Sequence, residues 1–139
     1  MKYYAAYGSN LSEEQMLFRC PDSKIIGTGK IVDYKLVFRL HADIMPCKDS
    51  EVPVLIWEIS KEDEKRLDRY EGVKGGYYHQ EVLPIIMDTG EKITAMAYIM
   101  NRQDFMELPS EEYYQVIEDG YTHFGFDKTK LEQALKEAE

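Results

Sequence analysis

Hydrophobic and polar residues alternate along much of the first sixty positions, a pattern typical of β-strands with one buried face. Residues 2–7 are aromatic and small, and they predict a first strand. Residues 34–41 alternate regularly and predict a strand whose apolar face includes Leu40. Residues 42–51 are mostly polar and contain a proline, so we interpret them as a loop, whereas residues 52–59 predict a strongly apolar strand.

Glycines and a tight turn indicate that the sheet is bent. Gly27 and Gly29 lie inside a β-like stretch, where glycine suggests a bulge, a bend or the close approach of two backbones. Further along, residues 88–91 predict a hairpin turn between strands at residues 77–87 and 92–100. Together these features suggest a curled sheet or a small barrel.

Helical segments occupy only a few of the connections. Residues 12–19 predict a short helix with Ser12 as its N-cap and Gln15 as the partner in a capping box. Ser60 precedes a helix at residues 61–70, which carries acidic residues in its first turn and basic residues later. Two closing helices are predicted at residues 110–124 and 127–138. The fold class is therefore α+β, because the strands are joined mainly by tight turns.

Composition narrows the class of protein. The 139 residues fit one domain, residues 1–139, which is long enough to bury a core without disulfides. The chain has 26 acidic and 17 basic residues, and this excess of acids argues against nucleic acid as the main partner. Cys20 and Cys47 make neither a disulfide framework nor a zinc site, and no apolar run has the length of a membrane helix. The N-terminal segment is too polar for a signal peptide, so we expect a cytoplasmic protein without a membrane partner.

The first candidate for a functional site is the segment Tyr7-Gly8-Ser9-Asn10-Leu11, between the first strand and the first helix. Gly8 allows a sharp turn and a close approach to a ligand. Ser9 and Asn10 add short polar side chains, and the free N–H groups at a helix start can hold an anion. An ordinary strand-to-helix turn favours the same residue types, so this segment alone leaves both interpretations open.

The second candidate is Glu71, which lies just before Gly72 at the end of the helix at residues 61–70. The partial negative charge of a helix C-terminus disfavours a carboxylate there, and the neighbouring Tyr70 helps to shield it from water. Both effects raise the pKa, and a carboxyl group that titrates near the working pH can accept and return a proton. The alternative is a solvated surface glutamate, one of the 26 acidic residues.

Other candidates are weaker. His41, His79 and His123 are far apart and match no ligand spacing, so we expect no metal. His41 with Cys47 would suit a thiol nucleophile, but loop or core positions are the simpler interpretation. Arg39 is either a partner for a substrate carboxylate or a surface arginine. The chain contains no phosphate loop and no dinucleotide fingerprint, so no nucleotide cofactor is expected.

In combination, the two segments resemble the gamma-glutamylcyclotransferase-like family, which includes the AIG2-like and gamma-glutamylamine enzymes. The resemblance rests on YGSNL at residues 7–11, on LDRYEGV at residues 67–73 with the later Tyr77-Tyr78, and on LPSEEY at residues 108–113. It spans residues 1 to about 135. It implies a small mixed β-barrel with flanking helices and a cavity at one rim. The YGSN form resembles the enzymes that act on gamma-glutamyl amines and amino acids.

The resemblance also implies a reaction. The loop of residues 7–11 is expected to wrap the gamma-glutamyl head of the substrate, and Glu71 is expected to be the catalytic acid and base. The alpha-amine of the substrate attacks its own gamma-carbonyl and releases 5-oxoproline and an amine or amino acid, without a cofactor or a metal. Tyr7, Tyr78 and Tyr113 are further candidates for the wall of the cavity.

Two alternatives remain at this stage. One is an enzyme of the same family that removes a gamma-glutamyl protecting group within a biosynthetic pathway. The other is a non-catalytic protein that binds a small molecule in the same cavity, because a fold does not fix a function. The sequence does not indicate which gamma-glutamyl amide is bound or what the oligomeric state is. It also does not indicate whether the loop amides hold the oxyanion or the alpha-carboxylate.

Overall fold

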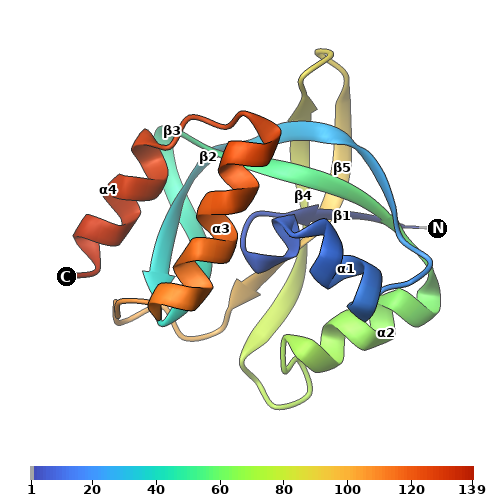
Figure 1. Cartoon of the computed structure of the whole chain (residues 1–139), viewed down its shortest axis with the longest axis horizontal. Helices are drawn as coiled ribbons and strands as arrows, with labels where there is room; N and C mark the ends of the chain where they lie inside the picture. The colour runs from blue at the N-terminus through green and yellow to red at the C-terminus, as the bar shows by residue number, and fades with distance from the viewer. Residues whose placement is uncertain (1) are drawn as a thin grey trace.

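The computed structural model describes residues 2–139 and shows a closed barrel of five strands with helices packed around it (Figure 1). The elements are β1 (Lys2–Ala6), the 3-10 turn η1 (Ser9–Leu11), α1 (Glu13–Arg19), β2 (Lys24–Arg39), β3 (His41–Ile59), α2 (Lys61–Tyr70), β4 (Tyr78–Met87), β5 (Lys92–Met100), α3 (Glu111–Phe124) and α4 (Thr129–Glu137). The spatial order is β1-β3-β2-β4-β5, and a short parallel contact between Tyr4 of β1 and Met96 of β5 closes the barrel. This mixed barrel with flanking helices confirms the predicted α+β class.

The barrel curves at the two glycines of β2. The register of β2 against β3 shifts between Ile25 and Gly27, which is a β-bulge. At Gly29, a Cβ atom would lie 2.7 Å from the carbonyl oxygen of Ile86 and 3.1 Å from the Cα of Met87 in β4. Only glycine therefore allows β2 and β4 to pair at this point. The bulge and the close approach expected from these glycines are confirmed.

Residues 42–51 belong to strand β3, so the predicted loop is wrong. β3 pairs with β2 on both sides of an irregularity next to Asp33. Asp33 (φ 63°) and Asp49 (φ 65°) adopt left-handed conformations there, and the Asp33 carboxylate accepts a hydrogen bond from the Asp49 N–H at 3.0 Å. Residues 46–51 resemble a loop because most of their side chains are exposed on this long hairpin, while pairing with β2 satisfies its backbone.

The turn between β2 and β3 corrects two further predictions. Leu40 has a φ of 68° and is 44% exposed, so it does not belong to the buried face of the strand. Arg39 is buried, and its Nε donates to Oδ2 of the buried Asp43 at 3.0 Å. The Asp43 carboxylate also accepts hydrogen bonds at 2.9 Å from the N–H of Met100 and from the side chain of Gln103. Arg39 is therefore neither a surface residue nor available to a substrate carboxylate.

Capping side chains begin the helices at the predicted positions. The Ser12 side chain accepts a hydrogen bond from the N–H of Gln15 at 3.2 Å. In α2, Ser60 and Asp63 form a complete capping box, with the Asp63 N–H donating to the Ser60 hydroxyl at 3.1 Å. The box expected in α1 is not completed, because the side chain of Gln15 donates instead to Asn10. This difference places Gln15 beside the loop that precedes α1.

Candidate active site

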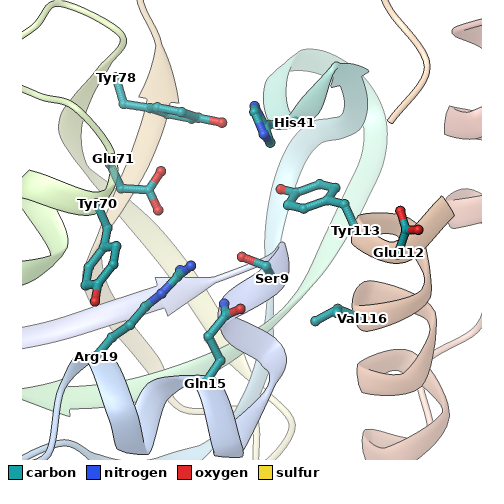
Figure 2. A pocket seen from close by; sticks show the side chains of 10 residues that line it. All are labelled: Ser9, Gln15, Arg19, His41, Tyr70, Glu71, Tyr78, Glu112, Tyr113 and Val116. Carbon is teal, nitrogen blue, oxygen red and sulfur yellow. The ribbon is translucent and has the colours of Figure 1, made fainter. Parts of the chain in front are cut away.

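A cavity of about 410 Å³ lies between α1 and the end of α2 on one side and the start of α3 on the other (Figure 2). It continues into a smaller space of about 30 Å³ beneath the loop that follows β1. Ser9, Glu71, Tyr78 and Tyr113 line both spaces. The fold thus brings the two candidate segments and two of the candidate tyrosines together around one cavity, although they are far apart in the sequence.

The carboxylate of Glu71 points into this cavity from the C-terminal end of α2 (Figure 2). Its backbone N–H donates to the carbonyl of Leu67 at 2.8 Å, and Gly72 follows with a φ of 65°, so the end of the helix fixes where the side chain starts. Burial raises the pKa of Glu71 to about 7, while the positive charge of Arg19 acts in the opposite direction. Glu71 is therefore a partly buried carboxyl group whose pKa lies near neutral pH, and not a fully solvated surface residue.

The loop after β1 approaches the cavity closely because of Gly8. A Cβ atom at Gly8 would lie 3.2 Å from the Cβ of Ala42, which is tighter than most such contacts. The loop then forms η1, in which the first N–H groups, those of Ser9 and Asn10, have no partner within the turn. The hydroxyl of Ser9 points into the cavity on the side opposite Tyr78 (Figure 2). The loop therefore supplies neutral hydrogen-bond donors beside Glu71.

The side chain of Asn10 holds the loop in place. It is 3% exposed, and its Nδ2 donates to the hydroxyl of Tyr4 at 2.9 Å. Its Oδ1 accepts hydrogen bonds from Gln15 and Arg19, both at 3.0 Å. The backbone oxygen of Asn10 accepts a hydrogen bond from the indole of Trp57 at 3.1 Å. The side-chain amide and the backbone oxygen of Asn10 are therefore occupied by protein partners, and only its backbone N–H remains suited to the predicted contact with substrate.

Leu11 does not line the cavity that contains Glu71. It is 1% exposed and packs against Gly120 of α3, where a Cβ atom would lie 2.6 Å from the Cβ of Leu11. The predicted contact of Leu11 with the substrate is thus replaced by a packing role. The close approach fixes the loop and α3 relative to each other, and α3 in turn carries Tyr113.

The three candidate tyrosines share backbone partners but differ in the direction of their hydrogen bonds. Tyr7 donates its proton to the carbonyl of Tyr98 at 2.6 Å, and Tyr78 donates to the carbonyl of Ala42 at 2.8 Å. In contrast, Tyr113 accepts a hydrogen bond from the N–H of Ala42 at 3.0 Å, so its own proton remains available to the cavity. Burial raises the pKa of all three, that of Tyr113 to about 12. They are neutral phenols at physiological pH.

Arg19 is a cavity residue that sequence analysis missed. It lies in the last turn of α1, and its guanidinium points into the cavity beneath Glu71 (Figure 2). The guanidinium lies 4.5 Å from the centroid of the Tyr70 ring and donates to Asn10. A signal was available, since Arg19 follows Gln15 by one helical turn and therefore shares its face of α1. Arg19 supplies a positive charge that acts on Glu71 and lowers its pKa.

Two further tyrosines, Tyr4 and Tyr98, line the floor of the cavity, and His41 and Glu112 line its outer wall. The Tyr98 hydroxyl donates to the carboxylate of Asp68 at 2.6 Å. Sequence analysis did not single out these tyrosines, because they are two among the 11 in the chain. The floor of the cavity is therefore more aromatic than the motifs alone indicated.

The structure gives no support to the other candidate sites. Among residues 2–139, no cluster of three or more His, Cys, Asp and Glu side chains is arranged to hold a metal ion. His41 lines the cavity, but Cys47, its hypothetical thiol partner, does not. In the same part of the chain, each helix lacks the length and apolar character needed to cross a membrane.

Comparison with known proteins agrees with this geometry. The chain is 32% identical over 126 residues to the gamma-glutamylcyclotransferase of Mus musculus and 30% identical over 126 residues to that of Homo sapiens. Each alignment covers 82% of this chain, but only 66% of the length of the mammalian protein. A solved structure of a gamma-glutamyl cyclotransferase superimposes with a TM-score of 0.84 and 28% identity, covering 99% of this chain and 88% of the other.

Residues 51–128, more than half of the chain, match the AIG2-like family. This segment contains Glu71, Tyr78 and Tyr113, whereas the loop of residues 7–11 precedes it. The alignments to the mammalian relatives cover a larger share of the chain. The barrel, the cavity and these matches together show that the chain belongs to the AIG2-like, or gamma-glutamylcyclotransferase-like, family.

Proposed function

We propose that this protein is a gamma-glutamyl cyclotransferase that converts a gamma-glutamyl amide into 5-oxoproline and a free amine or amino acid. The observation that carries the proposal is the partly buried carboxyl group of Glu71. Its pKa is raised by desolvation to about 7, and it points into a cavity lined by neutral hydroxyl groups. The names of the relatives support the same reaction.

The reaction needs only one substrate molecule. The nitrogen of the alpha-amine attacks the gamma-carbonyl carbon and forms a new C–N bond, which closes a five-membered lactam. The original C–N bond to the leaving amine then breaks. Because nucleophile and electrophile belong to the same molecule, the main task of the protein is to hold the folded conformer of the substrate. The reaction is redox-neutral and consumes no water.

Glu71 moves the proton that this reaction requires. The attacking amine loses a proton as the bond forms, and the leaving nitrogen must gain one to depart as a neutral amine. A carboxyl group with a pKa of about 7 has both protonation states available near neutral pH, so it can accept the first proton and deliver it to the leaving nitrogen.

The directions of the hydrogen bonds suggest how the substrate is oriented. Tyr7 and Tyr78 donate their protons to backbone carbonyls, so their free lone pairs can accept hydrogen bonds from the N–H groups of the neutral alpha-amine. Tyr113 keeps its proton, which suits the gamma-oxygen as negative charge develops on it. Arg19 and the amide of Ser9 suit the alpha-carboxylate. In this arrangement the reacting groups lie between Glu71 and Tyr113.

The proposal is tested by incubating the purified protein with gamma-glutamyl amino acids, gamma-glutamyl amines and gamma-glutamyl-lysine isopeptides. Mass spectrometry then measures 5-oxoproline and the released amine in equal amounts. Release from at least one class supports a cyclotransferase. Release of free glutamate without 5-oxoproline would indicate hydrolysis. Tight binding without any product would favour the non-catalytic alternative, and turnover confined to one biosynthetic intermediate would favour a deprotecting enzyme.

The cellular context forms part of the same proposal. The substrate is a small molecule, and the strong excess of acidic residues argues against nucleic acid as the main partner. Cys20 and Cys47 are both free thiols, as expected in a reducing compartment, and we place the protein in the cytoplasm. Fractionation of the producing cells, with detection of the protein in each fraction, tests this assignment.

A further inference from the structure

An open groove of about 590 Å³ begins at the mouth of the cavity and runs over α1 and α2. Its walls are Phe18, Arg19, Arg66, Arg69 and Tyr70. Arg19 and Tyr70 also line the catalytic cavity, so the groove and the cavity are continuous. The two helices that form the groove lie side by side on the outside of the barrel (Figure 1).

The groove is basic, although the protein is acidic. Three of the five arginines in the chain line it, while the formal net charge is −9. Arg66 is partly neutralised by the carboxylate of Asp63, at 3.3 Å. Arg69 is exposed in the last turn of α2, and no ion pair to it is found within residues 2–139. The groove therefore offers guanidinium groups to an anionic ligand.

The groove also exposes aromatic surface. Phe18 is 83% exposed and Tyr70 is 51% exposed, and both rings lie among the arginines. Large apolar side chains that stay in contact with water next to a binding cavity often mark a surface that a ligand covers. A ligand that fits this groove combines negative charges with apolar segments.

We propose that the groove binds the amine portion of the substrate, and that this portion is an extended chain with more than one carboxylate. The glutamate of gamma-glutamyl-glutamate is the simplest case. The inference rests on the proposed cyclotransferase function. Carboxylates of such a chain can pair with Arg66 and Arg69, while the methylene groups between them pack against Phe18 and Tyr70. The chain leaves the cavity past the stacked side chains of Arg19 and Tyr70 and continues over α2.

A neutral amine makes poorer use of this groove, because it leaves the guanidinium groups to water. Elsewhere the acidic surface repels a polyanionic chain, so the groove determines where such a chain can lie. The attraction involves partly exposed charges, and it must therefore weaken as salt is added. Both features distinguish this proposal from a groove that selects only by shape.

The test compares gamma-glutamyl-glutamate with gamma-glutamyl-glutamine, which have nearly the same shape and differ by one carboxylate. Isothermal titration calorimetry with the Glu71→Gln protein measures binding without turnover. We expect the glutamate compound to bind about three- to tenfold more tightly at low ionic strength, a range set by one or two exposed charge pairs. We expect this preference to decrease at high ionic strength.

Substitutions at Arg69 assign the preference to the groove. Arg69→Gln should lower the affinity ratio toward one, and Arg69→Glu should lower it further; both replace an exposed side chain, so the fold is not at risk. Lys65→Gln is the matched control, because Lys65 is exposed on the same helix but lies outside the groove. The control should leave the ratio unchanged.

The outcomes test the groove and the cyclotransferase function separately. Equal affinity for the two compounds, or a preference that Arg69→Glu does not alter, overturns the proposed groove. Wild-type protein is assayed in parallel for 5-oxoproline. Turnover without a preference for the glutamate compound contradicts only the groove. A preference that depends on Arg69, without any release of 5-oxoproline, supports the groove as a binding site and contradicts only the cyclotransferase function.

Discussion

Replacing Glu71 with glutamine is expected to make the protein more stable above neutral pH. Burial raises the pKa of Glu71 from its ordinary value of 4.5 to about 7, so between these values the folded protein binds more protons than the unfolded chain. The free energy of unfolding therefore falls as the pH rises through this range. Above pH 7 the accumulated cost is about 3 kcal/mol, because each pKa unit corresponds to about 1.4 kcal/mol. Glutamine cannot ionise and avoids this cost.

Urea unfolding at a series of pH values measures the effect. The stability difference between Glu71→Gln and wild-type protein should be smallest below about pH 4.5 and should grow by up to about 3 kcal/mol by about pH 8. At the higher pH this corresponds to a melting temperature raised by on the order of 10 °C. Glu91→Gln, in the exposed hairpin turn, is the control and should show no such trend. A stability difference that does not vary with pH would refute the reasoning.

Three further predictions concern the surroundings of Glu71. The charge of Arg19 lowers the pKa of Glu71, and the acid limb of the kcat/KM profile is expected near pH 7. Arg19→Gln should therefore move this limb to higher pH, which initial rates across the pH range measure. Tyr113→Phe removes a donor to the reacting oxygen and should lower kcat by about 100-fold in steady-state assays. Gly120→Ala places a methyl group 2.6 Å from the Cβ of Leu11 and should destabilise the protein by about 1–3 kcal/mol in urea unfolding.

Two of these variants have matched controls on α3. Tyr114→Phe, on the neighbouring residue of α3, should leave kcat unchanged, and an equal loss in both variants would remove the special role of Tyr113. Glu118→Ala, at a partly exposed position of α3, should not reproduce the destabilisation by Gly120→Ala. A pH profile that Arg19→Gln leaves in place would mean that another group sets the acid limb.

Local signals in the sequence predicted most of the fold. Ser12 and Ser60 cap helices where their positions indicated, because a cap depends on residues within one helical turn. Gly27 and Gly29 indicated the bent strand, because a bulge and a close backbone contact both require a residue without a side chain.

Predictions that depended on distant partners were less successful. Residues 42–51 are polar and resemble a loop, but they form a strand because β2 supplies its backbone partners. The sequence left Arg39 either at the surface or beside a substrate carboxylate, but Asp43, four residues away and across the turn, allows it to be buried. In both cases the deciding interaction arises from the hairpin, which local sequence does not specify.

In the cavity, too, local signals identified some residues, whereas residues that depend on distant partners were missed. Glu71 was found because a carboxylate just before a stop glycine is unusual and because its motif is paired with the loop of residues 7–11. Arg19 was missed because a basic residue in the last turn of a helix is ordinary. Its orientation depends on Asn10 and Tyr70, which only the fold brings to it. Leu11 shares the loop motif, but it serves the packing of α3.

The central claim is that Glu71 transfers the proton during cyclisation, and one comparison tests it most directly. Wild-type and Glu71→Gln protein are incubated with the best gamma-glutamyl amide found in the panel, and 5-oxoproline is measured by mass spectrometry. Both proteins are first shown to be folded by circular dichroism. The account predicts that the variant keeps its fold and its affinity for the substrate but forms no 5-oxoproline above the uncatalysed rate. Formation of 5-oxoproline by the folded variant at the wild-type rate would contradict the claim.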